Sequence, residues 1–174
     1  MYLYYTNRLC GWASRVLRWL FMQLSEIFLG QGEPQFTELL RGISIGKLKT
    51  YQLYARMKVR LHLTKLNSES LRKAAPKFWA RLVERDEEFA SELAQAILVS
   101  HLDMIKAVLD EIGIPNQDGF FDKDIDGGKY FTDGWQQRSY EKFKDVYPPQ
   151  VLLFYINHLA WELAKSEQVF QVPV

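Results

Sequence analysis

The sequence predicts an all-α fold, a single-domain helical bundle of five to seven helices around a central long helix at about 86–112. Apolar residues recur at steps of three and four along most of the chain, which is the pattern of amphipathic helices. Glycine and proline separate these periodic stretches, as they do at helix ends. With 174 residues, 48% of them hydrophobic and 25% charged, the chain can bury the core of one domain.

The first predicted helix covers residues from about 8 to 29, where an apolar stripe has helical spacing and is followed by Gly30 and Gly32. We expect an N-terminal amphipathic helix within 1–32, packed on the core or lying on a membrane surface, and a helical bundle domain at 33–174. Arginines interrupt the N-terminal stretch, so no apolar run reaches the ~20 residues that a transmembrane segment needs.

The single cysteine, Cys10, excludes an internal disulfide and leaves a Cys/His zinc site short of thiols. A lone cysteine fits a reducing compartment, so the predicted location is cytoplasmic. The 11 Phe, 9 Tyr and 5 Trp suit a homo-oligomer interface, and they equally suit a well-filled core.

The second predicted helix starts at Pro34 and ends before Gly42, and a third is expected over 47–66. Within the third stretch, apolar and polar residues alternate over 57–64, which is the period of a strand. A lone strand would have no pairing partner among helices, so helix is the preferred interpretation. Pro76 is expected to divide or kink the next helix.

The strongest helical pattern runs over 86–112, where a wide apolar arc faces a polar side. Gly113 and Pro115 then follow in the order that is typical of a helix end. The width of the arc predicts a central helix of the bundle, and a loop is expected over 114–132.

Polar caps predict the starts of two further helices. Asn67 and Ser68 are the candidate N-cap residues of the first. Asp133, with Gln136 three residues later, resembles a capping pair. A proline pair then precedes a final apolar helix at 150–166.

Charge is unevenly distributed, although the formal net charge is only +1. Residues 1–68 contain ten Lys and Arg against three acids, whereas the remainder contains twelve against eighteen. Between residues 39 and 68 there are seven basic residues and no acid. Either the two halves dock on each other, or the basic run is a face for an acidic partner, a nucleic acid or a protein.

The leading functional hypothesis is a non-enzymatic helical binding module whose basic face at 41–65 engages that partner. Lysine and arginine contact phosphates, and the rings of Tyr51 and Tyr54 between them are suited to stacking on bases. The candidate binding residues are Lys47, Lys49, Arg56, Lys58, Arg60 and Lys65.

Arg56 and His62 resemble the Arg-x(4–6)-His pair of the helical HEPN ribonucleases. Met57 stands where that family usually has a polar residue, and the resemblance covers only seven residues. No family is assigned on this basis.

The alternative hypothesis is an enzyme or a metal-binding protein with a polar pocket between two helices. His101 lies on the apolar stripe of the central helix, and His158 precedes Glu162 by one turn on the last helix, with Tyr155 on the same face. If these helices are neighbours, the four side chains could perform general acid–base work or hold a metal. The simpler interpretation is a core histidine and a helix-surface pair.

A calcium loop at 122–133, "DKDIDGGKYFTD", is a further alternative. Aspartates at its first, third and fifth positions and glycine at the sixth match the start of an EF-hand loop. Against this, Lys129 would oppose a cation, and no continuous helix leads into the loop, so an acidic turn is the other interpretation. The candidate ligands for Ca²⁺ are Asp122, Asp124, Asp126, the carbonyl of Gly128, and Asp133.

Overall fold

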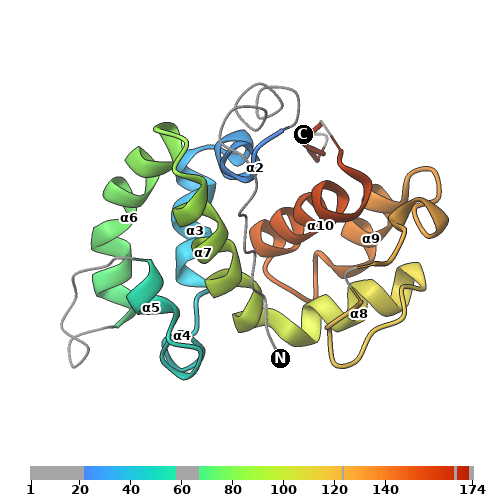
Figure 1. Ribbon diagram of the computed structural model, residues 1–174, viewed down its shortest axis with the longest axis horizontal. Helices are drawn as coiled ribbons and strands as arrows, with labels where there is room; N and C mark the ends of the chain where they lie inside the picture. The colour runs from blue at the N-terminus through green and yellow to red at the C-terminus, as the bar shows by residue number, and fades with distance from the viewer. Residues whose placement is uncertain (1–21, 58–66, 123, 167, 173–174) are drawn as a thin grey trace, which may run out of the picture.

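The computed structural model describes residues 22–57, 67–122, 124–166 and 168–172. Every regular element within these ranges is helical, which confirms the predicted all-α fold (Figure 1). No helix in the described part is long and apolar enough to cross a bilayer. The elements are α2 (Leu24–Gln31), α3 (Glu33–Arg41), α4 (Ile45–Thr50), α5 (Leu53–Arg56), α6 (Ser68–Val83), α7 (Glu87–Leu98), η2 (Val99–His101), α8 (Leu102–Ile112), η3 (Gly127–Lys129), α9 (Trp135–Phe143) and α10 (Pro149–Ala164).

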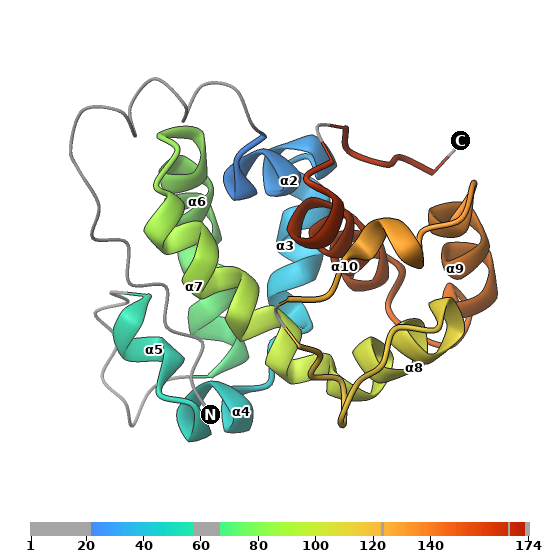
Figure 2. The same ribbon diagram turned by 45° about the vertical axis from the view of Figure 1, so that its right-hand side comes forward.

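The helices form two groups that meet along α2, α3 and α10 (Figures 1 and 2). In one group α3 packs along α6, and α7 packs against α2 and α6; in the other, α10 packs against α9. The stacked rings of Phe28 and Phe154, 4.6 Å apart at their centroids, connect α2 to α10. Because α10 also contacts α2 and α3, it joins the two groups into one core.

The predicted central helix at 86–112 is present as α7, the 3₁₀ turn η2 and α8, which follow one another without a gap. The axis bends at η2, and α8 turns away from α7 toward the other end of the molecule (Figure 1). The Ser100 hydroxyl donates to the Ala96 carbonyl at 2.8 Å and accepts from the Ser44 amide at 2.9 Å. A serine that bonds back by one turn often bends a helix, which accounts for the change of direction.

The continuous helix predicted from about 8 to 29 is wrong in its described part. The two residues before Leu24 are not helical, and α2 starts only there; residues 1–21 lie outside the described residues. The start is fixed by another helix, because Oε2 of Glu87 accepts the Leu24 amide at 2.9 Å and satisfies one donor of the first turn. The described part of α2 belongs to the common core, and the domain division after residue 32 stays a prediction.

The single helix predicted over 47–66 is wrong in its described half. Between α4 and α5, Gln52 has a φ of 55°, a left-handed conformation through which a helix does not continue. Residues 58–66 lie outside the described residues, so the choice between helix and strand there stays a prediction.

Two other expectations about helix boundaries have different outcomes. Asn67 caps α6 as predicted, and Pro76 lies inside that helix, so one helix spans the position. The predicted cap of α9 is wrong, because Gly134 with a φ of 70° occupies the capping position. The carbonyl of the neighbouring Asp133 instead accepts a hydrogen bond from Arg138.

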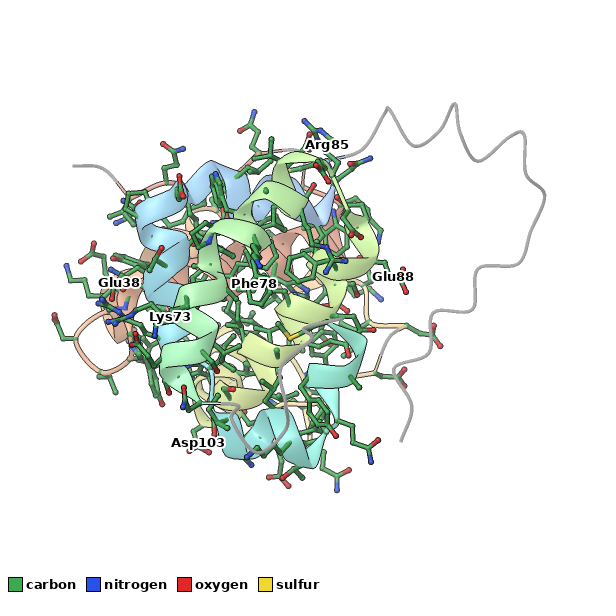
Figure 3. All side chains as sticks on the ribbon, turned by 90° about the vertical axis from the view of Figure 1, so that its left-hand side faces the viewer. Glu38, Lys73, Phe78, Arg85, Glu88 and Asp103 are labelled. Atoms are coloured by element: carbon green, nitrogen blue, oxygen red, sulfur yellow. The ribbon has the colours of Figure 1, made fainter. Side chains whose placement is uncertain are left out.

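The space between α6 and α7 is filled with aromatic rings. Phe78 and Phe89, both buried, tilt against each other at 5.2 Å. Figure 3 shows Phe78 inside the helical layer, whereas Lys73 and Glu88 extend outward from it. These rings form part of the core, so the aromatic content here serves packing.

Candidate functional site

The basic face starts on α4, which serine contacts hold in place. The Ser44 hydroxyl accepts the Lys47 amide at 3.4 Å, and the Ser44 amide donates to Ser100 at the bend of the central helix. Leu48 is fully buried. Because successive helical residues point in different directions, Lys47 and Lys49 flank the buried leucine and are both exposed.

Lys47 and Lys49 form no ion pair with any residue that the structure describes. By contrast, Arg41 at the end of α3 is paired with Glu38 at 2.6 Å. Tyr51 follows α4 and is 42% exposed, so a ring accompanies the two cations at the surface. The interpretation that the two halves of the chain neutralise each other therefore does not apply to these two lysines.

Three of the other four basic candidates lie outside the described residues. Arg56 is the last residue of α5. Lys58, Arg60 and Lys65 lie outside the described residues, as does His62 of the HEPN-like pair. The basic face at 41–65 is thus described at its α4 end.

Two polar residues of the alternative site are in contact on α10. Nδ1 of His158 lies 3.5 Å from Oε2 of Glu162, and the side chains are 13% and 30% exposed. Burial lowers the pKa of His158 to about 4 and raises the pKa of Glu162, an effect that the nearby charge of Lys165 partly opposes. The imidazole is therefore neutral near neutral pH, and the contact is not an ion pair.

Tyr155 lies on the same face of α10 and is 2% exposed. Its hydroxyl has no hydrogen-bond partner among the described residues. Burial, followed by the charge of Glu162, raises its pKa well above the usual value. The tyrosine is therefore a neutral, buried group near an acid.

His101 is at the bend of the central helix, next to a different part of α10. A Cβ at Gly42 would lie 2.9 Å from Nε2 of His101 and 3.2 Å from Cγ2 of Val151. Burial lowers the pKa of His101, an effect that the nearby backbone of Gly42 partly opposes. Val151 precedes His158 by two turns, about 10 Å along a helix. The described contacts do not join the two histidines, and their convergence in one pocket stays a prediction.

The aspartates of the 122–133 loop make local backbone contacts. Oδ1 of Asp122 accepts the Asp124 amide at 3.3 Å, and Oδ1 of Asp126 accepts the Gly128 amide at 3.1 Å, as in Asx turns. In the described residues, no three His, Cys, Asp or Glu side chains gather closely enough to hold a metal. For this loop, calcium binding and the acidic turn both stay hypotheses.

The loop glycine has a packing role that the sequence analysis missed. Gly127 is buried, and a Cβ there would lie 2.6 Å from Cβ of Leu163 and 3.1 Å from its carbonyl oxygen. Only glycine allows the loop to approach α10 this closely. Phe131 of the same loop also lies close to this glycine, and its ring stacks on Trp135, the first residue of α9, at 4.3 Å. Packing on α10 is therefore sufficient reason for glycine at this position.

Sequence reasoning also missed Asn157, which binds the C-terminal segment, defined as residues 168–172. Asn157 is 1% exposed; its Nδ2 donates to the Phe170 carbonyl at 3.0 Å, and the Phe170 amide donates to its Oδ1 at 2.7 Å. A buried amide needs such partners. The signal was present as a lone asparagine in an apolar helix.

A cavity of about 290 Å³ lies beside the C-terminal segment. Its walls come from α2, α3, α9, α10 and the segment itself, and they carry no charged side chain. None of the residues predicted for binding, catalysis or metal lines it.

Comparisons of the chain with protein-family models, with curated proteins and with solved structures found no match.

Proposed function

We propose that the protein is a non-enzymatic helical binding module whose basic face at 41–65 engages an acidic partner, a nucleic acid or an acidic protein. The observation that carries the proposal is the exposure of Lys47 and Lys49 on α4, without an acidic partner among the described residues. No acid occurs from residue 39 to residue 68 to reduce the positive potential locally.

The surface ring favours a nucleic acid over an acidic protein. Tyr51 is 42% exposed and lies two residues after Lys49. Cations that neutralise phosphates beside a ring that stacks on bases are the two components of single-strand binding surfaces. Tyr54 is partly buried against the core, so Tyr51 is the better candidate for stacking.

Fluorescence anisotropy with a labelled single-stranded RNA, and separately with a polyglutamate peptide, tests the proposal. Between about 50 and 200 mM salt the affinity should fall, and each lost phosphate contact should reduce the log–log slope by about 0.7. Lys47→Glu/Lys49→Glu should weaken binding. Lys77→Glu/Lys129→Glu is the matched control, because it makes the same charge change at two exposed lysines elsewhere.

Binding of RNA but not of polyglutamate would favour the nucleic acid, and the reverse would favour an acidic protein. Equal weakening by both double variants would show that net charge, rather than the α4 surface, governs binding. Absence of salt-sensitive binding to either probe would contradict the proposed function.

A further inference from the structure

The C-terminal segment is held as an extended peptide would be held in a binding site. Both backbone polar groups of Phe170 are paired with the one side chain of Asn157. A third bond, from Nδ2 of Asn157 to the Leu153 carbonyl at 3.0 Å, fixes the orientation of that amide. Such a contact recognises the main chain of the bound segment, in the way that a neighbouring β-strand does.

The side chain of Val169 has its own position in the site. A Cβ at Gly30 of α2 would lie 3.2 Å from both Cγ1 and Cγ2 of Val169, and Val169 supplies the three atoms nearest to it. Gly30 is the last residue but one of α2, and its lack of a side chain leaves room for the Val169 methyl groups. We call the surface formed by Gly30 and Asn157 the tail site.

The segment lies at the surface of the domain, and its side chains are not fully buried. Val169 and Phe170 are only partly buried, and Gln168 and Gln171 are exposed. The link is short, because α10 ends at Ala164 and the segment starts four residues later. Lys165 within this link has a φ of 51°, a conformation that is unfavourable for lysine. Short hinges under strain favour the exchange of a terminal segment between copies.

We propose that the tail site also binds the C-terminal segment of a second copy of this chain, so that two copies exchange their segments in a dimer. Each copy carries both the site and its ligand, so the contacts of Val169 and Phe170 are the same within one chain and between two. Exchange then requires that the link opens, and a reciprocal exchange closes with two-fold symmetry. This inference is independent of the basic face.

The test uses two full-length variants that complement each other. Gly30→Val closes the tail site but leaves the segment intact, and its new side chain meets Val169 first. Val169→Asp replaces the methyl groups that pack on Gly30 with a charge, so the segment binds poorly, but the tail site itself is unchanged. We expect each variant alone to be monomeric and the equimolar mixture to form a dimer of twice 20.5 kDa by light scattering, because the mixture has no competing segment on the open site.

Gly46→Val provides the control, since position 46 is an exposed helical glycine whose Cβ would meet only Oγ of Ser44, at 3.8 Å. In Gly46→Val the chain's own C-terminal segment still occupies its tail site. An equimolar mixture of Gly46→Val and Val169→Asp should therefore contain less dimer than the mixture of Gly30→Val and Val169→Asp. Equal pairing by both would overturn the assignment of the tail site. Circular dichroism and thermal melts establish that all three variants are folded.

A second readout follows the Asn157 side-chain amide of isotope-labelled Val169→Asp by NMR. Addition of Gly30→Val should shift this signal, whereas Gly30→Val/Phe170→Asp should not. A shift with a synthetic peptide of residues 166–174 but not with Gly30→Val would overturn the second copy as the occupant. No shift with either at millimolar concentration would overturn binding in trans altogether.

Discussion

Nδ1 of His158 lies 3.5 Å from Oε2 of Glu162, one turn further along α10. Burial shifts the pKa values of these two side chains in opposite directions. The pKa of His158 is lowered to about 4, and the pKa of Glu162 is raised. Both shifts favour the uncharged form of the group. The pair therefore responds to pH in a way that a surface ion pair would not.

We expect His158 to make the protein sensitive to acid. The unfolded imidazole binds a proton near pH 6.5, whereas the folded one does so only near pH 4, so the free energy of unfolding falls as pH drops through this window. In His158→Gln the loss between about pH 7 and about pH 4.5 should be smaller, by on the order of 2 kcal/mol. Urea unfolding of both proteins at the two pH values measures the difference.

Glu162 changes the free energy of unfolding with pH in the opposite direction to His158. Because the pKa of its folded carboxyl is raised, the unfolded carboxyl ionises first as pH rises above 4.5, and stability falls with rising pH. Glu162→Gln removes this loss of stability at higher pH. It serves as the control that separates the contribution of Glu162 from that of His158. Identical acid dependence in the wild type and His158→Gln would contradict the prediction.

Removal of the Tyr155 hydroxyl should stabilise the protein. The group is buried and has no described partner, and an unsatisfied buried polar group costs about 1–3 kcal/mol. We therefore expect Tyr155→Phe to raise the free energy of unfolding by about 1 kcal/mol. Tyr51→Phe, at an exposed ring, should leave it unchanged. A loss of stability in Tyr155→Phe would mean that the hydroxyl has a partner.

Gly127→Ala should destabilise the loop that packs on α10. Its Cβ would lie 2.6 Å from Cβ of Leu163, and overpacking of this kind costs about 1–3 kcal/mol. Gly128→Ala is the neighbouring control, because its Cβ would meet only Asp126, at 3.3 Å. In thermal melts, Gly127→Ala should have a lower melting temperature than Gly128→Ala. Equal stability would show that close approach is not what position 127 requires.

Helical periodicity was enough to predict the central helix, because its apolar arc is formed by residues within one continuous stretch of sequence. The bend within it depends on Ser100, whose hydroxyl also accepts the amide of Ser44 from a segment 56 residues earlier. The start of α2 depends in the same way on Glu87, 63 residues later. Local spacing contains no information about either contact, so the bend was not predicted and the predicted start of the first helix was wrong.

In the candidate sites too, some features follow from local sequence and others depend on contacts between distant residues. The exposure of Lys47 and Lys49 follows from their position around the buried Leu48, and this pattern is readable on α4 alone. The role of Asn157 depends on the return of the chain to place Phe170 beside it. An isolated polar residue in an apolar helix indicates that it has a partner, but it does not identify that partner.

Calcium should leave the melting temperature unchanged after the protein has been stripped with a chelator. Asp122 and Asp126 each accept a backbone amide of their own loop, and the described carboxylates do not gather in a group of three. A ligand at a hundred times its dissociation constant would add about 2.7 kcal/mol, which is a rise of about 5–10 °C for a chain of this size. A rise with calcium that Asp124→Ala abolishes would contradict the prediction. It would also mean that the loop rearranges around the ion, because its carboxylates are not gathered in the present conformation.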